Sequence, residues 1–156
     1  MLYLSLGSNS GDRRSNLETA VQRIGSDIGP VLLRSNIIET EPWGFTSGNM
    51  FLNMAVAVET GLSPVQILDI TQQIERDLGR VRKSIGGIYS DRPIDIDILL
   101  CGDAVIHTER LTVPHPLMTG RKFVMEPLAQ IAPDTVHPVL GLTIRQLATE
   151  LQKKNG

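Results

Sequence analysis

The sequence is poor in several kinds of feature, and each shortage narrows what the protein can be. A single cysteine, Cys101, among 156 residues excludes an internal disulfide framework and a thiolate metal cluster. No apolar run approaches the ~18 residues that a membrane-spanning helix needs, and no basic-then-apolar leader precedes the first expected strand. Basic residues are not in surplus, since 15 Lys and Arg stand against 17 Asp and Glu, whereas dedicated nucleic-acid binders usually carry a basic excess. We therefore expect a cytoplasmic, single-domain protein, residues 1–156, that binds neither nucleic acid nor membrane.

Aromatic residues are also scarce, and they are unevenly placed. A small domain usually spends its aromatic side chains on the core, but here most lie in expected connections. They either anchor loops or stack on a flat ring of a ligand, and their distribution alone leaves both interpretations open. The six are Tyr3, Trp43, Phe45, Phe51, Tyr89 and Phe123.

Hydrophobic periodicity predicts six core elements in the order strand, helix, strand, strand, helix, strand. Their expected ranges are 2–6, 13–28, 31–40, 51–58, 64–78 and 94–101. The second helix has the clearest start, with Ser63 as its cap, Pro64 in its first turn and Gln66 three residues after the cap. This order is that of an α+β, ferredoxin-like fold (βαββαβ), an antiparallel sheet with two helices on one face. Short strands near 105–106 and 111–113 and helices over 121–131 and from 144 form a C-terminal extension.

The last core strand carries the strongest chemical signal. Side chains alternate along a strand, so one face is expected to hold Asp95, Asp97, Leu99 and Cys101, and the other Ile94, Ile96, Ile98 and Leu100. Two carboxylates about 7 Å apart at their Cα atoms can converge on divalent ions, and oxygen ligands suit Mg²⁺. A solvated edge strand explains the same spacing.

The residues before this strand form a cationic loop with two adjacent glycines. Its basic residues are Arg80, Arg82, Lys83 and Arg92, against one acid, Asp91. In isolation a solvated loop explains it. Beside two metal-binding carboxylates, however, arginines are what phosphoryl transfer needs to hold the developing charge.

Two further segments invite a phosphate-binding interpretation. Pro114 and Pro116 pin His115 in extended geometry, where it is either a donor to a phosphate or a histidine in a turn. The stretch Gly7–Gly11 closes the first strand, and we interpret it as a structural turn because it lacks the lysine of a P-loop.

Three segments together resemble a known family. Arg80-Val81-Arg82, Asp91-Arg92-Pro93-Ile94-Asp95-Ile96-Asp97 and Leu111-Thr112-Val113-Pro114-His115-Pro116 are similar to the signatures of 6-hydroxymethyl-7,8-dihydropterin pyrophosphokinase, and the similarity runs in order along nearly the whole chain. The resemblance implies a ferredoxin-like monomer that transfers the β,γ-diphosphoryl group of ATP to the pterin's hydroxymethyl oxygen. AMP would be released, and the product would serve folate biosynthesis.

The resemblance also implies a role for each matching residue. Asp95 and Asp97 would hold two Mg²⁺ ions, and Arg82 and Arg92 would clamp the transferring group. The nucleotide would be bound by these arginines together with Gln72, Glu75, Ile98, Arg110, Thr112, His115 and Arg121. The pterin pocket would comprise Thr40, Glu41, Pro42, Trp43, Phe51, Asn53, Asp95 and Phe123, with Phe51 and Phe123 sandwiching the ring and Asn53 bonding its amide edge. Tyr89 would help to form the lid, where some members of the family carry Arg-Trp.

Two other functions stay open from the residues alone. A non-catalytic ferredoxin-like module could bind a small ligand or RNA, although RNA binding favours aromatics on central strands and a basic sheet face, and the expected strands carry neither. A Mg²⁺-dependent nucleotidyl transferase would release pyrophosphate instead of AMP.

Overall fold

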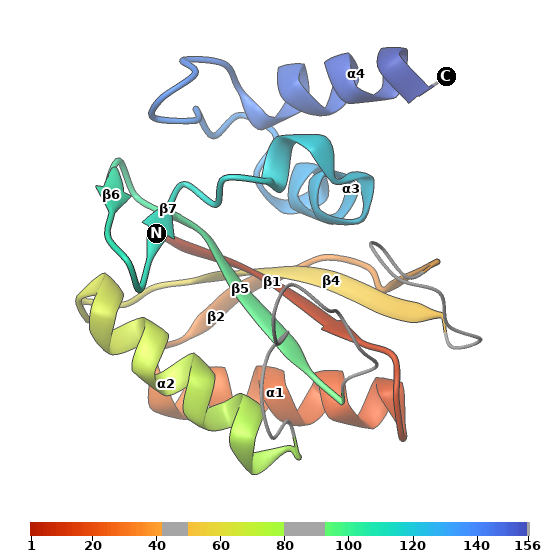
Figure 1. Ribbon diagram of the computed structural model, residues 1–156, viewed down its shortest axis with the longest axis vertical. Helices are drawn as coiled ribbons and strands as arrows, with labels where there is room; N and C mark the ends of the chain where they lie inside the picture. Colours follow the sequence, from red (N-terminus) through yellow and green to blue (C-terminus); the bar gives the residue numbers. More distant parts are fainter. Residues whose placement is uncertain (42–49, 80–92, 156) are drawn as a thin grey trace.

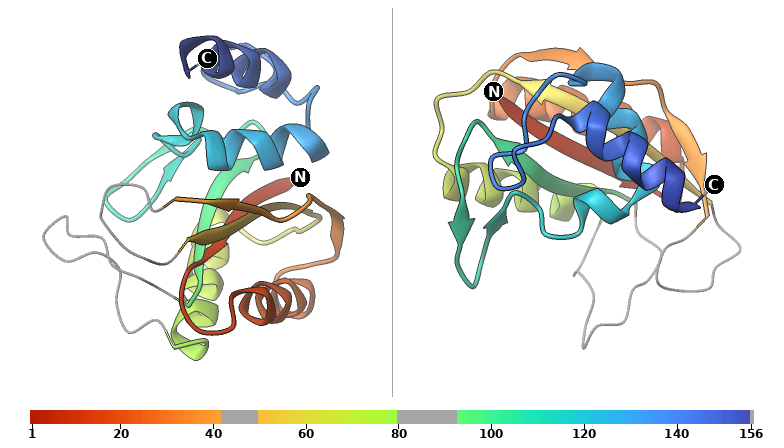
Figure 2. Two further views of the ribbon diagram at one scale, coloured as in Figure 1. Left: turned by 90° about the vertical axis from the view of Figure 1, so that its right-hand side faces the viewer. Right: turned by 90° about the horizontal axis from the view of Figure 1, so that it is seen from above.

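The computed structural model describes residues 1–41, 50–79 and 93–155. These residues form an α+β arrangement in which helices cover both faces of one antiparallel sheet (Figure 1). Helices α1 (Arg13–Asp27) and α2 (Pro64–Asp77) lie on one face. On the other face lies α3 (Lys122–Ile131), preceded by the short turn η1 (Met118–Gly120), and α4 (Ile144–Asn155) lies over α3 (Figure 2).

The sheet brings strands together that are far apart in the sequence. Its strands run in the order β2-β4-β1-β5, with β3 also paired to β4, and each pair is antiparallel. A second, two-stranded sheet follows. The bounds are Leu2–Ser8 (β1), Val31–Arg34 (β2), Ile38–Thr40 (β3), Phe51–Val58 (β4), Asp95–Cys101 (β5), Ile106–His107 (β6) and Thr112–Val113 (β7). The predicted α+β class and antiparallel sheet are confirmed.

Helix α2 begins and ends as its sequence predicts. The Ser63 hydroxyl accepts a hydrogen bond from the Gln66 backbone N–H, and the Gln66 side chain accepts one from the Ser63 N–H, which completes a capping box. Gly79 follows the helix with a φ of 104°, a left-handed conformation that glycine adopts without steric cost.

The prediction of one strand over 31–40 is wrong, because the ladder breaks at Ser35. The Ser35 N–H donates to the Ala55 carbonyl (2.9 Å), but it is the Ser35 hydroxyl that accepts from the Ala55 N–H (2.9 Å). The next N–H, of Asn36, turns to the Gln130 side chain of α3 (2.8 Å). A side chain thus replaces a backbone acceptor, and β2 and β3 become separate strands.

The alternation predicted for β5 holds up to Ile98 and fails beyond it. The register between β1 and β5 shifts by one residue, which leaves Leu99 as an extra residue of a β-bulge. Leu99 and Leu100 therefore both pack on the α3 side, whereas Cys101 contacts the core under α1 and α2. The expected placement of Leu100 with Ile98, and of Cys101 with Asp97, is wrong for this reason.

Two aliphatic cores stabilise the fold, one on each side of the sheet. The first lies between the sheet and helices α1 and α2, and the second between the sheet, α3 and α4. Tyr3 and Phe123 are only partly buried against the second core. In the part of the chain that the structure describes, no helix has the length and apolar character needed to cross a membrane.

Candidate active site

The sheet face that α3 covers carries the residues expected to bind substrate and metal. In one row of the sheet, Gly7 of β1 lies between Asn53 of β4 and Asp95 of β5. Because neighbouring strands are about 4.8 Å apart, the Cα atoms of Asn53 and Asp95 lie about 10 Å from each other. In the next row on the same face, Ser5 lies between Ala55 and Asp97. The Asn53 amide and the two carboxylates thus share one face of the sheet.

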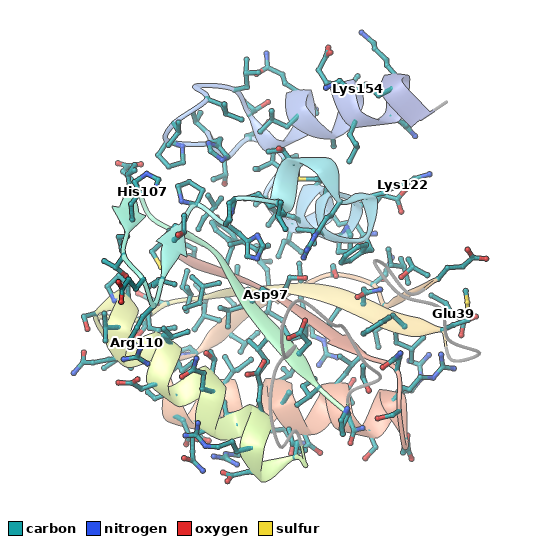
Figure 3. All side chains as sticks on the ribbon, viewed as in Figure 1. Glu39, Asp97, His107, Arg110, Lys122 and Lys154 are labelled. Carbon is teal, nitrogen blue, oxygen red and sulfur yellow. The ribbon has the colours of Figure 1, made fainter. Side chains whose placement is uncertain are left out.

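Both aspartates are half-buried on this face, with Ile96 between them directed into the opposite core. Asp97 lies on β5 near the centre of the molecule (Figure 3). The described residues contain no group of three or more His, Cys, Asp and Glu side chains that could hold a metal ion. Asp95 and Asp97 themselves offer only oxygen ligands. That all-oxygen donor set fits Mg²⁺, which is commonly bound by one or two carboxylates plus phosphates.

Glu75 of α2 is brought to the same strand. Its side chain is only 3% exposed, and Oε2 accepts a hydrogen bond from the Ile96 backbone N–H at 2.8 Å. A buried carboxylate therefore holds the peptide between the two aspartates.

The Asn53 amide is fixed by two neighbours. Its Nδ2 donates to the Thr40 hydroxyl at 2.6 Å. On the other side, a Cβ atom added at Gly7 would lie 2.9 Å from Asn53 Oδ1 and 3.4 Å from Phe51 Cδ1. Only a residue without a side chain leaves room there for Asn53 and Phe51.

Gly7 is the site residue that sequence reasoning missed. The sequence pattern predicts a turn at Gly7, but β1 continues through Ser8, and Gly7 is buried inside the strand. A glycine at the end of an alternating apolar run is a signal of close approach, and it could have indicated this position. Beyond β1, the Asn16 side chain of α1 donates to the Ser10 carbonyl (3.1 Å).

The two aromatic residues expected to hold the ring lie on elements that face each other. Phe51 opens β4 and shares a face with Asn53, whereas Phe123 lies in the first turn of α3, the helix that covers this face. The guanidinium carbon of Arg121, a buried residue, lies 5.7 Å from the Phe123 ring centroid. This is within cation–π range, so Arg121 and Phe123 support each other.

His115 is tied to the bulge of β5. Its N–H donates to the Leu99 carbonyl (3.0 Å), and its Nδ1 accepts from the Leu117 N–H (3.2 Å). With Nδ1 acting as acceptor, the neutral imidazole carries its proton on Nε2, which suits a donor to an anion.

The remaining residues expected at the nucleotide or the pterin lie on several different elements. Arg110, between β6 and β7, donates to Asp69 (2.6 Å) and to Gln72 (3.4 Å), so the structure brings Arg110 and Gln72 together on the exposed side of α2. Thr112 lies in β7, and the Ile98 side chain is buried in the core under α1 and α2. Glu41 is exposed after β3. The expectations for Pro42, Trp43, Arg82, Tyr89 and Arg92 concern residues outside the described ranges.

The environment of the lone thiol disfavours its reactive form. Burial raises the pKa of Cys101 above its ordinary value, which disfavours the reactive thiolate. Its predicted role in core packing agrees with its position against the first core.

Solved structures share this fold. The chain superposes on Plasmodium falciparum HPPK-DHPS, wild type, with a TM-score of 0.79 and 19% identity over 98% of this chain. The A437G form of that protein with SDX-DHP gives a TM-score of 0.80 at 19% identity. This chain spans 45% of each of those chains. The fold is therefore the one found in HPPK-containing chains.

The sequence comparisons identify the family. Residues 3–133 match the family model of 7,8-dihydro-6-hydroxymethylpterin-pyrophosphokinase (HPPK). A 2-amino-4-hydroxy-6-hydroxymethyldihydropteridine pyrophosphokinase of Porphyromonas gingivalis is 51% identical over 139 residues, which cover 88% of this chain and 94% of that protein. The enzyme of that name from Bacillus subtilis is 45% identical over 130 residues, covering 83% and 76%. The chain belongs to the HPPK family, and it is a pyrophosphokinase of folate biosynthesis.

Proposed function

We propose that the chain transfers the β,γ-diphosphoryl group of ATP to the hydroxymethyl oxygen of 6-hydroxymethyl-7,8-dihydropterin. The hydroxymethyl oxygen forms a bond to the β-phosphorus, the bond from that phosphorus to the oxygen bridging to the α-phosphate breaks, and AMP leaves. The hydroxyl proton passes to solvent. The row Asn53, Gly7, Asp95 supports this proposal, because an amide and a carboxylate on one face of the sheet, with Cα atoms about 10 Å apart, could bind the pterin ring and a metal ion.

In this proposal the side chains bind, orient and neutralise charge. Asp95 and Asp97 would hold two Mg²⁺ ions, which when bound would offset the charge of the phosphate oxygens. Arg82 and Arg92 would clamp the transferring group, and Nε2 of His115 would donate to a phosphate oxygen. No covalent nucleophile is required, because positioning and electrostatic stabilisation supply most of the rate in such transfers.

The pterin and ATP would bind next to each other on this face of the sheet. For the pterin, Phe51 and Phe123 would stack on the ring, and Asn53 would bond its amide edge. The remaining pterin residues would be Thr40, Glu41, Pro42, Trp43 and Tyr89. The remaining nucleotide residues would be Gln72, Ile98, Arg110, Thr112 and Arg121, whereas Glu75, expected among them from the resemblance, would act indirectly through the Ile96 N–H of β5.

The proposal also covers the finer description of the protein. The strand order β2-β4-β1-β5 with two helices on one face supports a ferredoxin-like core, to which the segment from β6 to α4 is added. We place the whole chain in one domain that acts as a cytoplasmic monomer.

A turnover assay tests the proposal directly. The protein is incubated with ATP, Mg²⁺ and 6-hydroxymethyl-7,8-dihydropterin, and AMP and pyrophosphate are quantified separately. AMP formed only when pterin is present supports diphosphoryl transfer, whereas pyrophosphate would identify a nucleotidyl transferase. The Asp95→Ala, Asp97→Ala double variant should lose the reaction. Asp103→Ala, which removes an exposed acid just after β5, should keep it.

A further inference from the structure

A buried carboxylate outside the proposed metal site bonds the backbone between the two proposed metal ligands. Glu75 of α2 is 3% exposed, and its Oε2 accepts from the Ile96 N–H at 2.8 Å. Asp95 and Asp97 flank Ile96 in β5, so this one hydrogen bond holds the Asp95–Ile96 peptide, directly after the first aspartate and one residue before the second.

The position of β5 in the sheet explains why a side chain is needed there. Within the described residues β5 is an edge strand, paired with β1 on one side only. In an antiparallel pair only alternate residues bond the neighbouring strand, so the backbone N–H groups between them point away from it. The Ile96 N–H is one of these, and α2 packs beside this edge. Without Glu75 this N–H would be buried next to α2 and would need another acceptor.

We propose that Glu75 is a positioning residue that sets the spacing and direction of the Asp95 and Asp97 carboxylates through the Ile96 N–H. This inference rests on the proposed function, because it assumes that the two aspartates hold the ions. It differs from a direct contact between Glu75 and nucleotide, because a positioning role needs a hydrogen-bond acceptor at Glu75 but no negative charge. Supports of this kind typically change metal affinity or activity by about 10- to 100-fold when removed.

Two conservative variants separate the acceptor from the charge. Glu75→Gln keeps an acceptor oxygen at the same reach and removes the charge. Glu75→Asp keeps the charge but is shorter by one carbon–carbon bond, about 1.5 Å, and so cannot maintain a 2.8 Å bond to the Ile96 N–H. Gln73→Asn, an equal shortening on the exposed side of α2, is the matched control.

Metal binding is measured on the whole protein by Mn²⁺ titration followed by electron paramagnetic resonance, with a non-hydrolysable ATP analogue present. The Mg²⁺ dependence of AMP formation is measured in parallel, and thermal unfolding confirms that each variant is folded. We expect Glu75→Gln and Gln73→Asn to stay within about threefold of the unmodified protein, and Glu75→Asp to bind Mn²⁺ at least about tenfold more weakly.

The opposite result, with weak Mn²⁺ binding in Glu75→Gln and nearly normal Mn²⁺ binding in Glu75→Asp, would overturn the inference in favour of a direct role of the charge. Equal affinity of all variants would overturn it as well. Failure of the unmodified protein to form AMP would count against the proposed function alone, because the Mn²⁺ titration does not depend on turnover. If Glu75→Asp does not fold, the Gln variant decides between acceptor and charge, since its loss of Mn²⁺ affinity contradicts the inference and its retention excludes a role of the charge.

Discussion

Replacing Gly7 by alanine tests whether this residue, the middle one of the row Asn53, Gly7 and Asp95, sets the position of the pterin ring. A Cβ atom at this position would lie 2.9 Å from Asn53 Oδ1 and 3.4 Å from Phe51 Cδ1. Ordinary C···O contacts begin at about 3.3 Å, so the Asn53 amide must move by a few tenths of an ångström. Asn53 is 3% exposed and is held by Thr40 at 2.6 Å, and its side chain therefore cannot move without weakening that hydrogen bond.

The size of the effect follows from the interaction that is disturbed. A net hydrogen bond contributes about 1 kcal/mol, and about 1.4 kcal/mol corresponds to a tenfold change in an equilibrium constant. We therefore expect Gly7→Ala to raise KM for the pterin about five- to tenfold. Because the nearest neighbours of a Cβ atom at Gly7 would be Asn53 and Phe51, both expected at the pterin, KM for ATP should change less than about twofold. The extra methyl group should also lower the free energy of unfolding by about 1–3 kcal/mol.

Steady-state kinetics with each substrate varied in turn measure both constants, and urea denaturation measures stability. Gly25→Ala is the matched control, because Gly25 is exposed in α1 and an added Cβ would lie 4.0 Å from its nearest neighbour, Val31 Cγ2. It should stabilise the helix by about 0.5–1 kcal/mol and leave both KM values unchanged. An unaltered pterin KM in a folded Gly7→Ala variant, or equal rises for both substrates, would refute the reasoning.

Three further predictions concern the metal, the ring and a buried histidine. Asp97→Asn keeps the side-chain shape but halves the carboxylate charge of the proposed metal site, so AMP formation should fall about 100-fold or more, and a comparable loss in Asp103→Asn would show that the effect is not specific. Phe123→Ala removes a stacking surface usually worth about 1–3 kcal/mol, so fluorescence titration should show pterin binding at least about fivefold weaker, and nucleotide binding should weaken less, because it loses only the support of Arg121 by the Phe123 ring. Burial lowers the pKa of His137 below its ordinary value of 6.5, and its Nδ1 accepts from two backbone N–H groups. The neutral form of His137 is thus favoured in the folded state. The contribution of neutral His137 to the free energy of unfolding is complete above pH 6.5, and it is lost as the pH falls below that value. Urea denaturation across this range should show a weaker pH dependence in His137→Gln, and identical slopes would contradict the assignment.

The features that could be predicted from the sequence are those decided by local geometry. The placement of Asp95 and Asp97 on one face requires only the two-residue repeat of a strand, and the register confirms it. The start of α2 requires only that Ser63 and Gln66 stand three residues apart. Neither depends on what packs around it.

The features that could not be predicted depend on a partner from elsewhere in the chain. Ser35 interrupts a strand only because Ala55 and Gln130 are beside it. Gly7 has a role in the site only because Asn53 and Phe51 approach it from β4. The local sequence pattern does not show which distant residues pack against a position. For this reason the sequence around Ser35 is consistent with a continuous strand, and the sequence around Gly7 with a turn.

The bulge at Leu99 shows how one such long-range feature connects the core to the site. Because the extra residue comes after Asp97, the aspartates keep their register with Ser5 and Gly7, whereas a one-residue slip before them would turn both carboxylates to the opposite face. Beyond the bulge, Leu99 and Leu100 both face the core under α3. The carbonyl of the extra residue, which has no place in the regular ladder, accepts the His115 N–H. The same inserted residue thus helps to anchor the C-terminal layer and holds the histidine segment to the strand that carries the proposed metal ligands.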